Sequence, residues 1–338
     1  MQIRRPFDAH LHLRDGAMLG AVAPATAADC DAAVVMPNLT PPVTTRAAAR
    51  AYRQRILDAL PTGSTFIPLL TAYLTDDIDG DEVVAGFRAG DWVAAKLYPA
   101  HATTNSDHGV TDVARIRPVL SAMAEAGMPL CVHGEVTDPE VDIFDREAVF
   151  LQRVLAPLLE QIPTLRVVVE HATTRAAVDF VAEAGPNVAM SITAHHLWWN
   201  RNALFAGGLR PHAYCLPVLK REEDRRALVK AATSGSERVF FGSDSAPHLV
   251  GRKEADCGCA GVFSAPTAVA AVAAVFDAEG ALDQLEGFLS LHGPRWYGRS
   301  PCRDTIELAP SPQVPEATLD TPDGPLRVFL GGETLAWS

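Results

Sequence analysis

The chain has 338 residues, of which 48% are hydrophobic, enough for one large domain or two modest ones with a substantial core. Its net charge of −12 makes it a poor general nucleic-acid binder, because phosphate neutralisation needs clustered lysine and arginine, although a small anionic substrate could still meet a local cationic site. No apolar run approaches the ~20 residues of a membrane-spanning helix, and no signal-peptide core follows the N-terminus. We therefore expect a cytoplasmic protein without membrane contact, whose six cysteines are reduced thiols.

Short apolar runs alternate with helix-like stretches along most of the chain. We expect strands at residues 7–13, 32–36, 66–70, 93–98, 129–133, 165–171, 188–192 and 238–244. The clearest helices are expected over residues 45–60, capped by Thr44 or Thr45, and over residues 113–126. Continuously apolar strands favour a parallel sheet covered on both faces. Eight βα units in about 250 residues predict a (β/α)₈ TIM barrel, with an open doubly wound sheet as the alternative.

The first expected strand carries two histidines. Side chains at alternate positions of a strand share a face, so His10 and His12 should point the same way, and Arg14 with them. Two imidazoles side by side on a rigid strand make half of a metal site. Alone, the pair would fit solvated or core histidines better than a metal site.

Four further polar residues stand at or near the carboxyl ends of expected strands: Lys96, His133, His171 and Asp244. Barrel enzymes keep their chemistry at this face. If the strands close into a barrel, these side chains converge with the two histidines of the first strand. Six possible ligands from five strand ends favour a metal centre over core filling.

The ordered motifs resemble those of the dihydroorotase family, short bacterial type, within the amidohydrolase superfamily. The resemblance rests on HLHLRDG at 10–16, MPNLTPPVTT at 36–45, AKLYPA at 95–100, ATTN at 102–105, VHGE at 132–135, EH at 170–171, YCLP at 214–217, DSAPH at 244–248 and CGCAG at 257–261. An HxH alone is a weak signal, whereas this ordered set is specific and spans nearly all of the expected barrel.

The resemblance implies two Zn²⁺ ions per subunit. His10, His12 and Asp244 would hold one ion, and His133 and His171 the other. Lys96 would bridge both as N6-carboxylysine, because a carbamate offers two anionic oxygens where an ammonium offers none.

The resemblance also implies the reaction. A hydroxide bridging the metals would attack the ring amide of dihydroorotate, while Asp244 acts as general base and then as general acid. In reverse, N-carbamoyl-L-aspartate would close to (S)-dihydroorotate in de novo pyrimidine (UMP) biosynthesis. The implied substrate contacts are His12, Arg14, Asn38, Thr103, Thr104, Leu216, His248 and Ala260, with the two threonines on a lid at residues 101–110.

Other cyclic amidohydrolases remain open: hydantoinase, dihydropyrimidinase and allantoinase. They generally place a β-domain before their HxH, whereas nine residues precede His10, and their dihydropyrimidine substrates lack the carboxylate that Arg14 would bind. A non-catalytic assembly partner is a further alternative, although such a protein would be expected to have lost ligands.

Several segments stay outside this scheme. Residues from about 294 to 338 are expected to form a C-terminal extension, with short strands at 304–308 and 326–330, packed on the barrel within a single domain. We interpret His195 and His196 as structural and assign no role to the Cys257/Cys259 pair. The family suggests a homodimer.

Overall fold

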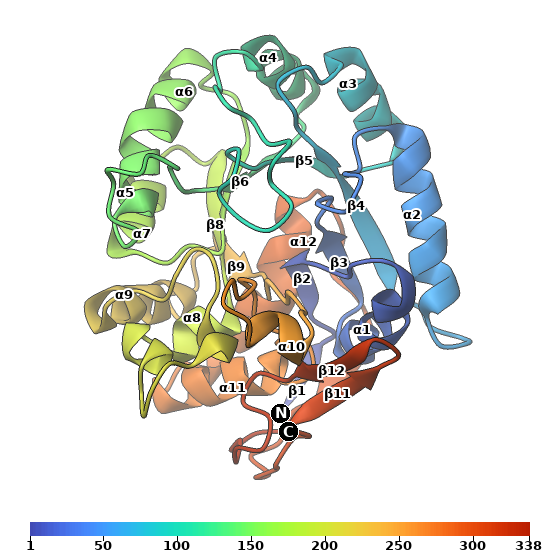
Figure 1. Cartoon of the computed structure of the whole chain (residues 1–338), viewed down its shortest axis with the longest axis vertical. Helices are drawn as coiled ribbons and strands as arrows, with labels where there is room; N and C mark the ends of the chain where they lie inside the picture. The colour runs from blue at the N-terminus through green and yellow to red at the C-terminus, as the bar shows by residue number, and fades with distance from the viewer.

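Eight parallel strands form the centre of the molecule, in a computed structural model that describes residues 1–338 (Figure 1). The sheet order is β2-β3-β4-β5-β6-β7-β8-β9, so each strand pairs with the next in the chain. The two edges meet where Asp244 N donates to His10 O (2.8 Å) and His12 N donates to Ser245 O (3.0 Å). The predicted (β/α)₈ barrel is confirmed.

The strands of the barrel are β2 (Phe7–Leu11), β3 (Ala32–Val35), β4 (Ile67–Tyr73), β5 (Ala94–Leu97), β6 (Leu130–His133), β7 (Val167–Glu170), β8 (Val188–Ile192) and β9 (Val239–Phe241). The remaining strands are β1 (Gln2–Arg4), β10 (Thr305–Glu307), β11 (Thr318–Thr321) and β12 (Gly324–Arg327). The α-helices are α1 (Gly16–Asp29), α2 (Arg46–Ala59), α3 (Gly80–Ala89), α4 (Arg117–Ala126), α5 (Arg146–Phe150), α6 (Ala156–Gln161), α7 (Arg175–Glu183), α8 (Ala194–Trp198), α9 (Glu222–Ala232), α10 (Val250–Lys253), α11 (Ala268–Ala278) and α12 (His292–Trp296). Short 3₁₀ or π segments are η1 (Leu151–Leu155), η2 (Arg201–Leu204), η3 (Pro211–Ala213), η4 (Leu282–Gln284) and η5 (Gly287–Leu291).

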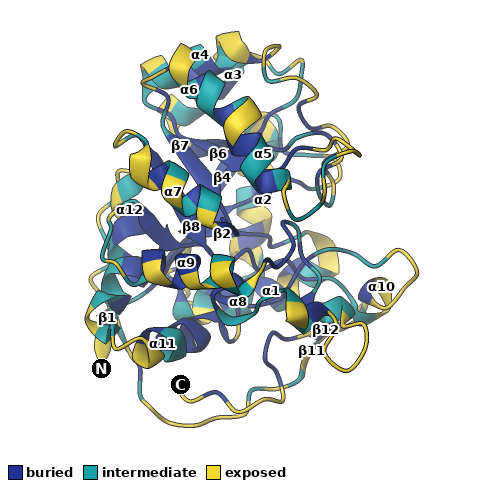
Figure 2. Cartoon of the chain, turned by 90° about the vertical axis from the view of Figure 1, so that its left-hand side faces the viewer, coloured by how far each residue is buried: buried dark blue, intermediate teal, exposed yellow.

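Alternate residues of the strands fill two separate cores. One cluster, which includes Val34, Val168 and Phe240, lies inside the barrel, and the larger cluster lies between the sheet and the helices. In Figure 2 the strands of the barrel are buried almost throughout, whereas the surrounding helices are exposed along their outer faces. Both faces of the sheet are therefore covered, which explains the continuously apolar runs. None of the helices combines the length and apolar character that a membrane crossing needs.

A register shift interrupts β2 just before the histidine pair. Phe7 and Ala9 belong to the inner cluster, but Leu11 and Leu13 belong to the outer one. The pairing of β2 with β3 is irregular between Asp8 and Leu11, as in a β-bulge. The strand thus changes which face its odd-numbered residues present. This change turns the even-numbered histidines toward the barrel mouth.

Of the two clearest expected helices, one begins where the sequence predicted and the other begins four residues later. The helix expected over residues 45–60 is α2, and Thr45 caps it by accepting a hydrogen bond from Ala48 N at 3.2 Å. The helix expected over residues 113–126 begins only at Arg117, because residues 111–116 form turns. Helix α4 starts with proline at its second position, a residue that suits a first turn because its missing N–H needs no partner there.

The C-terminal segment packs against the barrel in two places. The strand expected at 304–308 is β10, which pairs antiparallel with β1. The strand expected at 326–330 is shifted, because β12 ends at Arg327 and pairs with β11, which the sequence pattern did not predict. Leu326 also bridges to Leu249 beside the barrel mouth.

Candidate active site

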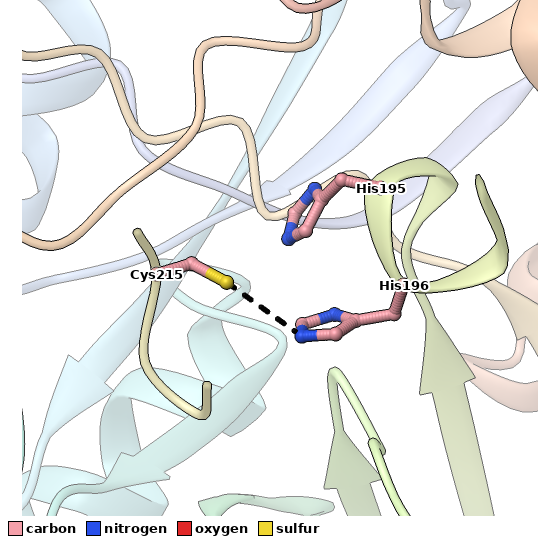
Figure 3. A group of neighbouring side chains, drawn as sticks. All are labelled: His195, His196 and Cys215. Carbon is pink, nitrogen blue, oxygen red and sulfur yellow. Dashed lines mark hydrogen bonds between the residues drawn. The ribbon is translucent and has the colours of Figure 1, made fainter. Parts of the chain in front are cut away.

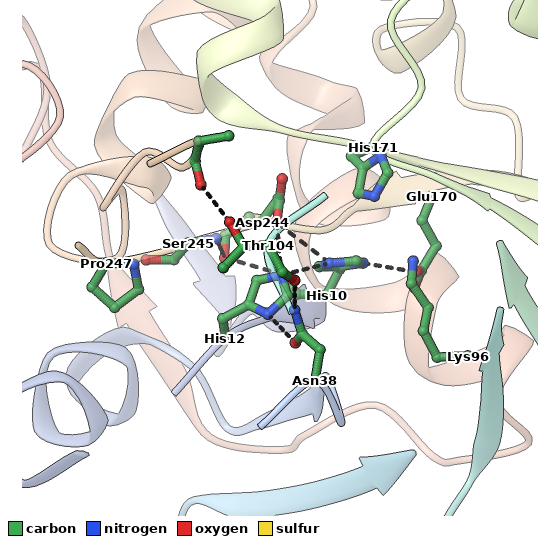
Figure 4. A network of polar contacts seen from close by, with 12 residues as sticks. His10, His12, Asn38, Lys96, Thr104, Glu170, His171, Asp244, Ser245 and Pro247 are labelled. Atoms are coloured by element: carbon green, nitrogen blue, oxygen red, sulfur yellow. Dashed lines mark hydrogen bonds and ion pairs between the residues drawn. The ribbon is translucent and has the colours of Figure 1, made fainter. Parts of the chain in front are cut away.

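Three ligand atoms meet at the closure of the barrel (Figure 4). His10 Nε2 and His12 Nε2 lie 3.4 Å apart, and Asp244 Oδ1 lies 3.4 Å from the first and 3.2 Å from the second. Two zinc–nitrogen bonds of ~2.05 Å at a tetrahedral angle place their nitrogens ~3.3 Å apart. The three atoms therefore stand almost at the separations that one tetrahedral ion requires.

The protonation states of His12 and Asp244 suit a cation. Burial lowers the pKa of His12 to about 4, so its imidazole is neutral at pH 7. Burial opposes ionisation of Asp244, but hydrogen bonds from His10 and His12 outweigh it and hold the pKa of the carboxyl well below its usual range. A neutral imidazole and an ionised carboxylate are the forms that coordinate metals.

The contacts of Nδ1 determine which ring nitrogen His10 and His12 turn toward the candidate metal position. His12 Nδ1 lies 2.8 Å from Asn38 Oδ1, which leaves Nε2 free for a metal. His10 Nδ1 lies 2.8 Å from Glu170 Oε2, with the same consequence for its Nε2. Although burial opposes protonation of His10, the Glu170 carboxylate raises its pKa.

A second histidine pair stands beside the first. The ring centroids of His133 and His171 are 4.9 Å apart, and those of His171 and His10 are also 4.9 Å apart. His133 Nε2 lies 2.8 Å from Glu135 Oε2, which leaves Nδ1 to face another partner. His171 Nδ1 is buried without a hydrogen-bond partner. An unpaired buried nitrogen is costly, so these residues also fit an ion better than an apolar core.

Lys96 lies between the two groups and is fully buried. Its Nζ contacts Glu170 Oε2, and it stands 4.9 Å from the centroid of the Tyr98 ring. Burial disfavours the Glu170 anion, but His10 and Lys96 together lower the pKa of its carboxyl. In this arrangement the unmodified amine already has an anionic partner inside the barrel.

The arginine after β2 faces the same pocket. Arg14 Nη2 lies 3.0 Å from His248 Nε2, and Arg14 Nε donates to Pro247 O at 3.2 Å. Burial and the Arg14 charge lower the pKa of His248 to about 2, so the imidazole is neutral and can accept from the guanidinium. The pair places a cation beside the three metal-ligand atoms.

The sequence predicted that strand alternation would turn Arg14 toward the same site as His10 and His12. Arg14 does line the pocket with them, but strand alternation is not the reason. Strand β2 ends at Leu11, so strand alternation does not extend to Arg14, whose φ is +60°. His171 and Asp244 also have φ near +42°. Non-glycine residues adopt this region rarely and at an energetic cost, and such residues cluster at functional sites.

Comparisons with known proteins identify the family. Residues 7–301 match the Amidohydrolase family. A dihydroorotase of Sphingopyxis alaskensis is 56% identical over 339 residues, which cover 100% of this chain and 98% of the relative. A dihydroorotase of Leptothrix cholodnii is 58% identical over 334 residues, which cover 98% of this chain and 96% of the relative. The solved dihydroorotase of Campylobacter jejuni superimposes with a TM-score of 0.91 at 35% identity, covering 100% of this chain and 96% of its own.

The chain belongs to the dihydroorotase family of amidohydrolases. It is therefore a cyclic amide hydrolase. The L-hydantoinase of Arthrobacter aurescens has a TM-score of 0.83 but only 16% identity, which is a likeness of fold alone.

Most of the predicted site residues of this dihydroorotase-family chain line one pocket: His10, His12, Arg14, Asn38, Thr103, Thr104, His133, His171, Leu216, Asp244 and Ala260. Two predicted residues are not part of this lining: Lys96, which is fully buried, and His248, which contacts Arg14. All six candidate ligands are present in this chain, so the loss of ligands expected in a non-catalytic homologue is not seen.

The loop at residues 101–110 covers the pocket. Asn38 Nδ2 donates to Thr104 O at 3.0 Å, and Thr104 Oγ1 donates to Ala260 O at 3.5 Å. Asn105 Nδ2 returns a bond to Asn38 O at 3.0 Å. Asn38 thus connects the loop to His12, one of the candidate metal ligands.

Sequence reasoning missed two carboxylates of the site. Glu170 lies in the EH motif at 170–171, but only the structure shows that its carboxylate contacts both His10 and Lys96. Glu135 likewise holds His133. A usable signal existed for Glu170, because a charged residue that continues the buried run Val167–Val169 must find a partner inside the protein.

Proposed function

We propose that the protein is a zinc-dependent dihydroorotase that interconverts N-carbamoyl-L-aspartate and (S)-dihydroorotate. The observation that carries the proposal is the juxtaposition of the His10, His12 and Asp244 ligand atoms with the Arg14–His248 pair. One side of the pocket suits a cation and the other suits a carboxylate. The solved yeast relative, with a TM-score of 0.89 and 32% identity, is a complex with 5-fluoroorotic acid.

Two zinc ions fit the donors present. His10, His12 and Asp244 would hold one ion and His133 and His171 the other, with Lys96 as N6-carboxylysine bridging both. When bound, the ions would lower the pKa of a shared water toward about 7 and polarise the amide carbonyl. Carboxylation of Lys96 would end its contact with Glu170, which would still orient His10.

Asp244 moves the proton. Its carboxylate is ionised and buried at the barrel closure, so it can accept a proton from the attacking water and deliver it to the departing ring nitrogen. In the cyclisation direction the same carboxylate takes the proton from the ureido nitrogen. The backbone bond from Asp244 N to His10 O (2.8 Å) holds this residue in place.

Pocket residues opposite the metal ligands orient the substrate. Arg14, with Asn38 and His248, would bind the carboxylate, because the guanidinium fork matches its two oxygens. Backbone groups of Leu216 and Ala260 would meet the pyrimidine edge. His12 and the loop threonines Thr103 and Thr104 complete the substrate contacts.

Metal removal tests the proposal directly. The protein stripped with a chelator should lose turnover of both dihydroorotate and N-carbamoyl-L-aspartate, and two equivalents of Zn²⁺ per chain should restore both. Restoration without bound zinc, as measured by elemental analysis, would contradict it.

Arg14→Lys should raise KM for dihydroorotate about tenfold with little change in kcat. Lysine keeps the positive charge but loses the fork, and a charge-assisted hydrogen bond is worth about 1.5–3 kcal/mol. Arg55→Lys is the matched control, because Arg55 pairs with Asp15 at the surface. An unchanged KM in Arg14→Lys would remove Arg14 from the substrate site.

The double variant Thr103→Val/Thr104→Val should lower kcat more than it raises KM. A docked loop excludes water from the reaction and can limit turnover, and valine retains the shape of threonine while removing its hydroxyl. Thr111→Val serves as control, because Thr111 bonds Asp76 on the outside. Steady-state kinetics equal to those of the parent would show that the loop hydroxyls have no catalytic role.

The same proposal extends to the cellular location, pathway, oligomeric state and domain organisation of the protein. We place the protein in the cytoplasm, in de novo pyrimidine (UMP) biosynthesis, as a homodimer with no nucleic-acid or membrane partner. Residues 294–338 would form one domain with the barrel, since β10 pairs with β1 and the β11–β12 hairpin borders the mouth.

A further inference from the structure

A second group of metal-ligating side chains lies outside the six candidate ligands. His195 and His196 come from α8, directly after β8, and Cys215 comes from the segment before α9 (Figure 3). One ligand atom from each lies within 4.8 Å of the others, and all three residues are buried. The group shares no residue with the pocket described above.

The closest pair already has the spacing of a zinc site. Cys215 Sγ lies 3.7 Å from His196 Nε2. Bonds of ~2.3 Å to sulfur and ~2.1 Å to nitrogen at a tetrahedral angle place these two atoms ~3.6 Å apart. The ring of His195 completes the group, with its centroid 4.5 Å from that of His196. The donor atom of His195 lies within 4.8 Å of the other two, so a contraction of at most about 1.5 Å would bring all three donors onto one ion.

The ring of His195 packs against Phe329 and His196, but no contact accounts for its two nitrogens. Its Nδ1 and Nε2 are both buried without a hydrogen-bond partner. A neutral imidazole has one donor and one acceptor, and leaving both unpaired in the interior costs free energy. Burial also lowers the pKa of His195 to about 4, so the ring is a neutral, available ligand at pH 7.

The other two residues can present their donors to an ion. His196 Nδ1 lies 2.8 Å from Thr193 Oγ1, a partner that would hold the tautomer in which Nε2 is free. In the metal-free arrangement, His196 Nε2 donates to Pro217 O at 3.1 Å, as the Cys215 thiol does at 3.3 Å. Ion binding would therefore move the ring proton of His196 from Nε2 to Nδ1, where Thr193 Oγ1 can accept it. That carbonyl oxygen is within reach of the group as a fourth ligand.

We propose that His195, His196 and Cys215 bind a borderline-soft divalent cation of the Zn²⁺ type, at a site distinct from the active site. Two imidazoles and one thiolate are a donor set that zinc accepts, and Pro217 O or a water would complete the tetrahedron. Binding would release the thiol proton of Cys215 to solvent, while both imidazoles are neutral before and after.

The proton release makes the site pH-dependent. Burial raises the pKa of the Cys215 thiol to about 12 in the metal-free protein, so the cation must displace a proton to bind. Affinity should therefore rise with pH. The ion would join α8 to the segment that carries Leu216, the residue proposed to face the pyrimidine edge.

Cobalt is the probe for this site, since a thiolate bound to Co²⁺ gives an intense near-ultraviolet charge-transfer band that nitrogen and oxygen ligands do not give. The full chain, first loaded with two equivalents of Zn²⁺, is titrated with Co²⁺. The titration uses a Cys257→Ser/Cys259→Ser background, because Cys257 is exposed and Cys259 partly so. We expect one further equivalent to bind and the band to appear.

Two variants in the same background test which residues bind the Co²⁺ that gives the band. Cys215→Ser should abolish it, and His195→Gln, which keeps a polar side chain of similar length, should weaken Co²⁺ binding at least about 100-fold. Circular dichroism verifies that each variant is folded. Absence of the band in the background protein, its persistence in Cys215→Ser, or unchanged affinity in His195→Gln would each overturn the proposal. None of these outcomes depends on whether the protein hydrolyses dihydroorotate.

Discussion

Asp244→Asn is expected to lower kcat for dihydroorotate hydrolysis by about 10²–10⁴-fold, the usual contribution of a positioned general acid or base. Asparagine has nearly the same shape and keeps an oxygen toward His10 and His12, but it cannot accept a proton. The loss should appear in both reaction directions, because the same carboxylate serves each. Steady-state kinetics in both directions provide the measurement.

Metal content must be measured on the same sample, because Asp244 is also a proposed ligand. A variant that has lost its zinc would report on coordination, whereas a loaded variant reports on proton transfer. Asp256→Asn is the control, since Asp256 is exposed on the loop after α10. Near-normal turnover of Asp244→Asn with full zinc occupancy would exclude the proton-transfer role.

Lys96→Met is expected to reduce bound zinc from two ions to at most one and to lower kcat by about 10²–10⁴-fold, since a catalytic metal supplies several kcal/mol of charge stabilisation. Methionine fills a similar volume but cannot form a carbamate. The substitution also leaves Glu170 with His10 as its remaining ionic partner. Elemental analysis and kinetics on the same preparation measure both effects.

The lysine modification has its own signature. Protein equilibrated with ¹³C-bicarbonate should show one carbamate carbon resonance, and Lys96→Met should lack it. Lys230→Met, on the exposed face of α9, should retain the resonance. Two zinc ions bound by Lys96→Met would show that the bridge is unnecessary.

The sequence predicted the barrel and the ligand set because both depend on local patterns. Apolar runs reveal buried parallel strands, and the residue that follows each run lies at the carboxyl face. Lys96 and His133 stand at or near the carboxyl ends of such runs, and the family resemblance then implied their roles as ligands. The C-terminal strands were harder, because β11 and β12 are short and mostly exposed, so no apolar periodicity marks their ends.

The orientation of the first strand could not be derived in the same way. Phe7, Ala9, Leu11 and Leu13 form one unbroken apolar alternation, yet the first two pack inside the barrel and the last two outside. The register shift near Asp8, whose Oδ1 accepts bonds from His10 N (3.0 Å) and Ser243 N (2.8 Å), produces this change. The bond from Ser243 depends on barrel closure, which joins residues far apart in the chain.

The residues that contact and orient the ligands could not be predicted from the sequence, for a related reason. Glu170 orients His10 from a strand five positions away in the sheet order, a contact across the barrel interior that no sequence spacing encodes. Asn38 similarly connects His12 to the loop over the pocket. The residues that coordinate can be predicted from strand ends, whereas those that orient them require the closed structure.

The most direct test of the central claim compares kcat/KM for dihydroorotate with that for dihydrouracil, using the same zinc-loaded protein. The two rings differ by the carboxylate that Arg14 and His248 are proposed to bind. We predict preference for dihydroorotate of at least about 10²-fold, and a much smaller preference in Arg14→Lys. Equal or faster hydrolysis of dihydrouracil or hydantoin would contradict the account and identify a different cyclic amidohydrolase.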